Sequence, residues 1–269
     1  MALLCVAACF PRLGQPWFRQ RCHIGRRTLS QIPCHGAVST RSLHELAGTY
    51  YRRARECDTL SHPAPESAKR SYRQASRLYE QILSRLDNSA EQPLATIDKT
   101  PIRMRLANCK VRLAEYADAI VVLEDVLRDK RGLVPAQVFA AVAYQEWGVA
   151  EESQQLITNA FIGSTPDIWG WRKIRQVTKQ VVDRKPSFKS YFFQADYNMA
   201  KCRFLLARIE NDRQRKMRIL IAARSGIAST EQSFPNLGGT DSQMRYQELL
   251  SAIQNELDEM KDKMETPDR

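Results

Sequence analysis

The chain has 269 residues, 43% of them hydrophobic, and holds only 11 glycines and 12 prolines, so its composition favours an all-α protein with a core in one domain or two. Its formal net charge is +11, but residues 1–44 hold six of the 41 basic residues and none of the 30 acidic ones. The rest of the chain has 35 basic and 30 acidic residues and therefore a net charge of about +5. A charge of this size does not by itself indicate nucleic-acid binding.

Residues 1–41 are predicted to be a disordered or targeting extension. They are rich in arginine and serine, lack acidic residues and open with the apolar run A-L-L-C-V-A-A-C-F, a combination typical of a mitochondrial transit peptide. We therefore expect the mitochondrial matrix if the organism is eukaryotic, and the cytoplasm if the segment is only a tail or precedes the true start. Two Cys-His pairs, at 22–23 and 34–35, lack the C-x2-C spacing of a zinc site, so we expect no metal and no cofactor.

Amphipathic helices are expected along the rest of the chain. Residues 44–54 and 68–83 predict two of them, separated by a loop that contains Pro63 and Pro65. The stretch R-L-A-N-C-K-V-R-L-A-E-Y-A-D-A-I-V-V-L-E-D-V-L, residues 105–127, predicts two helices joined at Ala114-Glu115. A helix at 168–184 follows, in a register that the sequence leaves open. No apolar run reaches the roughly 18 residues that a membrane helix needs.

The stretch 105–127 is repeated further along the chain. A shift of 34 residues places small residues on small ones, Ala107 on Ala141 and Ala114 on Gly148, and large apolar residues on large ones. Two helices approach closely only where one presents a small side chain. The positions expected to allow that approach are Ala107, Ala119, Ala141 and Ser153.

This period and these residues resemble the tetratricopeptide repeat family, most clearly over residues 100–167 and less clearly over 42–86 and 187–225. Leu106-Ala107-Asn108 stands where such repeats carry Leu-Gly-Asn, and Leu113-Ala114-Glu115-Tyr116 resembles their helix-to-helix turn. The resemblance implies an α-solenoid of antiparallel helix pairs in a right-handed superhelix, occupying residues 42–264. Cys109 and Cys202 would take the same repeat position, where we expect core packing rather than reactivity.

The C-terminal helix is predicted to begin at Thr240 or Asp241, after the turn F-P-N-L-G-G at 234–239. Apolar residues then recur at alternating steps of four and three: Tyr246, Leu250, Ile253, Leu257, Met260 and Met264. We interpret it as a capping helix that covers the end of the solenoid, followed by a disordered tail at 265–269. The alternative is a short coiled coil that dimerises the chain.

The resemblance also implies a concave groove lined by fixed positions of each first helix. Its lining here would be Met104, Asn108, Arg112, Val138, Val142, Gln145, Tyr197, Lys201 and Phe204. These apolar, aromatic and amide side chains suit a protein partner that presents a peptide or an amphipathic helix. The carboxylate clamp of chaperone-binding members is not expected, because Met104 and Phe139 stand where that clamp needs Lys and Asn. Each of the nine positions could equally be an inter-repeat packing contact.

A second interpretation rests on the basic stretch 172–189, which lies near aromatic residues and could bind nucleic acid. The residues it would use are Arg172, Lys173, Arg175, Lys179 and Lys185. Catalytic signatures are lacking, since there is no phosphate-loop, dinucleotide-binding or nucleophile-elbow motif, and no histidine after His62. We therefore expect a non-enzymatic adaptor, scaffold or assembly factor, with an RNA-associated or ribosome-associated helical-repeat protein as the alternative.

Overall fold

The computed structural model describes residues 39–58, 64–88, 98–182 and 184–265, with side chains up to residue 262. Over these ranges the chain forms ten α-helices and one short 3-10 helix, and no strand, which confirms the all-α prediction. The chain divides into two compact units, residues 1–113 and 114–269, and each is described by itself. Residues 1–38 of the extension expected at 1–41 lie outside the described residues, and Thr40 and Arg41 belong to α1. Pro63 of the first loop and residues 266–269 of the tail expected at 265–269 also lie outside them, and Glu265 is the last residue of α11.

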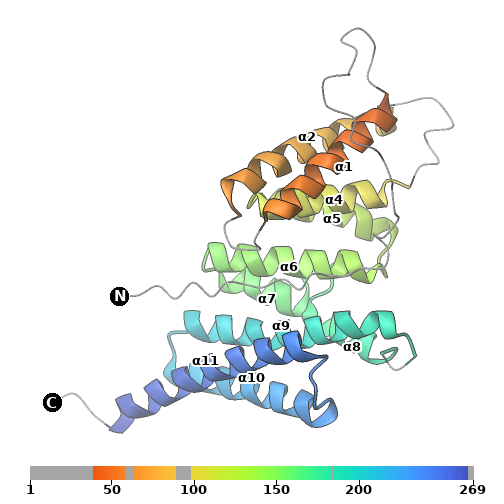
Figure 1. The fold of residues 1–269 in the computed structure, drawn as a ribbon. Helices are drawn as coiled ribbons and strands as arrows, with labels where there is room; N and C mark the ends of the chain where they lie inside the picture. The colour runs from red at the N-terminus through yellow and green to blue at the C-terminus, as the bar shows by residue number, and fades with distance from the viewer. Residues whose placement is uncertain (1–38, 59–63, 89–97, 183, 266–269) are drawn as a thin grey trace. The chain divides into compact units, whose positions relative to one another are not determined.

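The first unit contains α1 (Thr40–Cys57), α2 (Glu66–Asn88) and α4 (Thr100–Arg112), and α2 packs against both of the others (Figure 1). Helix α1 begins where the Ser39 hydroxyl accepts a hydrogen bond from the Ser42 amide, a standard N-terminal cap. Both helices expected in this region are confirmed, and each extends beyond its predicted bounds. The core of the unit contains both fully buried alanines, such as Ala47 and Ala75, and the large buried rings of Tyr72 and Tyr79.

The second unit contains seven α-helices: α5 (Tyr116–Asp129), α6 (Val134–Ala150), α7 (Gln154–Ile162), α8 (Trp171–Lys179), α9 (Lys189–Ile209), α10 (Arg213–Ser233) and α11 (Thr240–Glu265). A 3-10 turn, Pro186–Phe188, leads into α9. Consecutive helices pack against one another, and α9 also contacts α6 and α7 (Figure 1). Helix α8, within the region predicted at 168–184, packs on α6, α7 and α9. None of the described helices is long and apolar enough to cross a membrane.

The expected turn between the helices at 105–127 is confirmed. Helix α4 ends at Arg112, Ala114 adopts a left-handed φ of 63° and α5 begins at Tyr116. The next comparable turn has its left-handed residue at Glu152, with a φ of 49°, so the two turn residues are 38 positions apart. The sequence repeat has a shift of 34 residues. A shift of that size aligns the helices with one another, but it leaves these two turn residues four positions out of alignment.

Because the second turn lies four residues later than the repeat predicts, the close approach between α6 and α7 is made by Gly148 and not by the predicted Ser153. Ala107, Ala119 and Ala141 are fully buried, as expected. Ser153 instead caps α7, where its hydroxyl accepts a hydrogen bond from the Leu156 amide. The close approach of α6 to α7 is made by Gly148, because a Cβ there would lie 2.6 Å from Cγ1 of Ile157.

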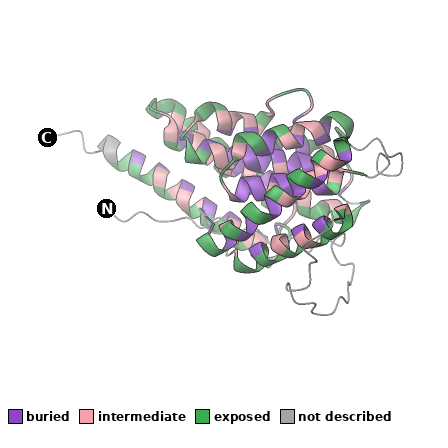
Figure 2. Ribbon diagram, turned by 90° about the horizontal axis from the view of Figure 1, so that it is seen from above, coloured by how far each residue is buried: buried purple, intermediate pink, exposed green. Residues whose placement is uncertain are grey.

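Helix α11 uses its predicted apolar positions inside the second unit. Tyr246 and Ile253 are fully buried, and Leu257 and Met260 nearly so, in one cluster with residues of α9 and α10. Leu249 joins this cluster although the predicted seam contained only Leu250 at that turn. Figure 2 shows buried and exposed residues alternating along this helix. This is the packing that the capping interpretation requires, whereas the coiled-coil alternative needs the same seam to face a second chain.

Candidate functional site

Arg112, one of the nine predicted groove positions, is part of a buried ion pair in the first unit. Its Nε lies 2.7 Å from Oδ2 of Asp58 and its Nη2 lies 2.6 Å from Oδ1, with the two side chains 5% and 3% exposed. The Tyr72 hydroxyl donates a third hydrogen bond to the same carboxylate, at 2.9 Å. Burial and the Asp58 charge both raise the pKa of Tyr72. The Arg112 charge is therefore engaged within the fold, where it joins α4 to the C-terminal end of α1.

The other two groove positions of the first unit, Met104 and Asn108, are partly exposed. The Asn108 side-chain oxygen accepts a hydrogen bond from the Tyr51 hydroxyl at 3.0 Å. Burial raises the pKa of Tyr51, so this hydroxyl keeps its proton and remains a donor at neutral pH. The side chain of Asn108 is thus hydrogen-bonded to Tyr51 of α1. Met104 is the apolar, partly exposed residue among the three predicted groove positions of this unit.

The three groove positions on α6 are internal contacts. Val138 and Val142 are 5% and 7% exposed, and Gln145 is 6% exposed. The Gln145 oxygen accepts from Trp171 Nε1 at 2.8 Å, and its Nε2 donates to Asn198 of α9 at 3.1 Å. Gln145 therefore joins three helices, α6, α8 and α9, through one buried amide.

The Gln145 oxygen also lies 3.2 Å from the Cys202 thiol, which donates to it. Burial raises the pKa of Cys202 to about 12, so the thiol stays protonated at neutral pH. Cys109 is fully buried as well. Both environments are those of core residues rather than nucleophiles.

The groove positions on α9, namely Tyr197, Lys201 and Phe204, are partly exposed and lie on one helix at spacings of four and three. The Tyr197 ring packs edge-on against Tyr246, with centroids 5.4 Å apart. Burial lowers the pKa of Lys201, and the nearby Glu146 charge opposes that shift. In the second unit the predicted groove positions on α9 are thus partly exposed, whereas those on α6 are buried.

The five predicted nucleic-acid residues separate into two groups. Lys173 lies over the Trp169 ring, 4.8 Å from its centroid, and Lys185 lies 5.9 Å from the Phe188 centroid. Arg172, Arg175 and Lys179 instead line an open hollow of about 590 Å³. The other lining residues are Gln176, Gln180 and Met199. We call this feature the α8 hollow.

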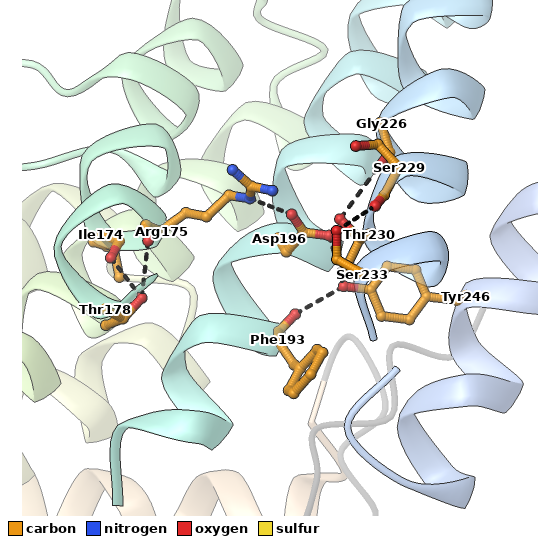
Figure 3. Close-up of polar contacts among 10 residues, drawn as sticks. All are labelled: Ile174, Arg175, Thr178, Phe193, Asp196, Gly226, Ser229, Thr230, Ser233 and Tyr246. Atoms are coloured by element: carbon orange, nitrogen blue, oxygen red, sulfur yellow. Dashed lines mark hydrogen bonds and ion pairs between the residues drawn. The ribbon is translucent and has the colours of Figure 1, made fainter. Parts of the chain in front are cut away.

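The amphipathic pattern of α8 explains why these cations share one face. Trp171, Ile174 and Thr178, spaced by three and four, are its buried residues. Trp171 is held by Gln145, and the Thr178 hydroxyl bonds the Ile174 carbonyl at 2.8 Å (Figure 3). With that stripe fixed inward, the basic stripe at 172, 175 and 179 faces the hollow.

The segment that precedes α8 is also fixed by a side chain. Gln137 of α6 donates to the carbonyls of Arg131 and Asp167 and accepts from the Trp169 amide at 2.7 Å. Gly163 has a φ of +104°, and a Cβ at Gly170 would meet backbone atoms at 2.4 Å, so the loop needs glycine at both places. Nothing in the sequence near Gln137 predicts this role, because an amide in a helix carries no signal of a distant loop.

Asp196 of α9 is the second residue that sequence reasoning missed. Its Oδ1 accepts from Arg175 Nε, and its Oδ2 lies 3.0 Å from the Tyr246 hydroxyl of α11, which also lies 3.2 Å from the Phe193 carbonyl (Figure 3). Burial and the Asp196 charge raise the pKa of Tyr246. One carboxylate thus connects α8, α9 and α11. The available signal was a lone acid in the otherwise apolar and amide stretch F-F-Q-A-D-Y-N-M-A.

Among the residues that the structure describes, no group of three or more His, Cys, Asp or Glu side chains could hold a metal ion. The sequence matches no protein-family model and no curated protein sequence.

Proposed function

We propose that the chain is a non-enzymatic adaptor or assembly factor whose helix pairs bind a peptide or an amphipathic helix of a protein partner. The observation that carries the proposal is the contact of α6 with α9 through Gln145 and Asn198, 3.1 Å apart. In a tetratricopeptide-like stack these would be the first helices of successive pairs, and neighbouring first helices would form a shared binding surface. The packing of consecutive helices supports that interpretation.

The contact surface we propose is the partly exposed face of α9 formed by Tyr197, Lys201 and Phe204, which we call the α9 face. The two aromatic rings can cover an apolar side chain of a partner, and the lysine between them can pair with an acidic one. Val138, Val142 and Gln145 of α6 are buried and are not part of this face, although Gln145 contacts Asn198 of α9. Charged substitutions at those buried positions would test folding rather than binding.

A site-specific crosslinker tests the proposal without removing an aromatic ring. Phe204 is replaced by the photoreactive p-benzoylphenylalanine, and the matched control carries the same residue in place of Ile221, which is 41% exposed on α10. We expect one protein to be crosslinked from position 204 and not from 221, and a synthetic peptide copying its crosslinked segment to compete. Equal crosslinking from both positions, or none from position 204, would contradict a partner site on the α9 face.

A further inference from the structure

The α8 hollow concentrates positive charge on one short helix. Arg172, Arg175 and Lys179 follow one another at spacings of three and four, so their side chains project from the same side. Arg172 and Lys179 are exposed. No acidic residue is among the described residues that line the hollow. Like charges on one side of a helix repel one another, and Asp196 offsets the charge of Arg175.

Buried neighbours hold this charge in place. Arg175 is fixed by Asp196, whose side chain is 7% exposed, and Asp196 is held by the Tyr246 hydroxyl (Figure 3). Burial lowers the pKa of Arg203, Asp196 raises it, and the charges of Arg172 and Arg175 lower it further. Arg172 and Arg175 therefore lie near enough to Arg203 of α9 for their charges to interact with it, and Asp196 partly offsets them.

The lining also selects the kind of anion. Gln176 and Gln180 add amide donors beside the cations, and Met199 adds an apolar surface. Arginine forks and amide donors match the oxygens of a phosphate group. The volume of about 590 Å³ lies in the range of small-ligand sites.

A single-stranded RNA site would need aromatic rings on which bases stack. No aromatic side chain is among the described residues that line the hollow, and the nearby Trp169 and Phe188 rings each have a lysine over one face. These features favour a compact phosphate over an extended nucleic-acid strand.

We propose that the α8 hollow binds a phosphomonoester dianion, with Arg172, Arg175 and Lys179 contacting its oxygens and Gln176 and Gln180 donating hydrogen bonds. The dianion adds negative charge beside Arg172 and Lys179, whereas Arg175 already pairs with Asp196. The site uses none of the α9-face residues, so its test is independent of the test of the adaptor proposal. The phosphate could belong to a free small molecule or to a phosphorylated protein side chain.

The test uses the full chain, with inorganic phosphate, O-phosphoserine and a short phosphoserine peptide with uncharged flanking residues as probes, followed by NMR of the amides of α8. We expect saturable shifts and binding that strengthens from pH 5.5 to 7.5, because the second pKa of a phosphate is about 6. Tighter binding of the peptide than of O-phosphoserine identifies a protein-borne phosphate, and equal binding identifies the phosphate alone; both support the site.

Charge-matched variants decide whether the hollow itself is responsible. Arg172→Gln with Lys179→Gln should weaken binding by at least about tenfold, since hydrogen bonds to charged groups are the stronger ones. Lys173→Gln with Lys185→Gln removes the same charge from outside the hollow and should leave binding nearly unchanged. Equal losses in both pairs, or no saturable binding, would overturn the proposal. So would tighter binding of a uridine oligomer without a terminal phosphate through the same residues, which would instead indicate the RNA-associated alternative.

Discussion

Replacing Asp58 by asparagine is expected to lower the free energy of unfolding of the first unit by about 3–5 kcal/mol. The two hydrogen bonds from Arg112, at 2.7 and 2.6 Å, are charge-assisted, and the side chains are only 3% and 5% exposed. Contacts of this kind contribute about 1.5–3 kcal/mol each, which gives a similar total. The loss arises because the Arg112 charge stays buried without its carboxylate.

A control at an exposed ion pair of α1 separates the effect of burial from the effect of charge. Glu45→Gln removes the exposed ion pair with Arg41, whose side chains are 59% and 91% exposed at a distance of 3.4 Å. We expect a loss of no more than about 0.5 kcal/mol there. Asp58→Leu combined with Arg112→Met removes both buried charges and should cost only about 1–2 kcal/mol, for the Tyr72 hydroxyl that loses its acceptor.

Native-state hydrogen exchange of amides in α1, α2 and α4 measures the stability of the first unit separately. A denaturation curve of the whole chain would combine the stabilities of the two units. The reasoning is refuted if Asp58→Asn costs no more than Glu45→Gln. It is also refuted if the double variant is as unstable as the single one, because the cost would then lie in lost packing rather than in an unpaired charge.

Two further predictions concern the second unit. Gly148→Ala should lower its stability by about 1–3 kcal/mol, measured by native-state hydrogen exchange of amides in α6 and α7, because the new methyl would lie 2.6 Å from Ile157; unchanged exchange protection would contradict the close approach of α6 and α7. Cys202 should resist iodoacetamide at pH 8 in the folded chain while the exposed Cys57 reacts, as measured by peptide mass mapping; equal rates would contradict the buried thiol. Since folding raises the pKa of Cys202 from 9.0 to about 12, its contribution to stability is present below pH 9 and is lost as the pH rises toward 12.

The local features of this chain follow from short-range sequence patterns. Apolar residues at spacings of three and four predicted helices at 44–54, 68–83 and 105–127, and the structure contains helices at all of them. The turn at Ala114 and the seam of α11 were predicted in the same way, because each depends on residues within about two helical turns. The displacement of one close-approach position from Ser153 to Gly148 has a local cause as well, since α6 continues to Ala150.

The roles of individual polar side chains depend on residues far away in the chain. Arg112 was predicted to line the groove, but it pairs with Asp58, which lies 54 residues earlier in the chain. Gln145 was predicted to line the groove as well, but it is hydrogen-bonded to Trp171 and Asn198. No pattern in one stretch records a partner in another, and a buried hydrogen bond needs only that the two atoms meet.

The helical character of the chain, the places of most of its helices and their apolar faces follow from the order of residues, because helix propensity and periodicity act over a few residues. The tertiary structure sets which charges stay available. It engaged Arg112 in a buried pair, placed Lys173 and Lys185 on aromatic rings and left Arg172 and Lys179 around the α8 hollow. The physical reason is that the environment of a charge is set by whichever helices pack beside it, and that packing brings together residues separated by tens of positions.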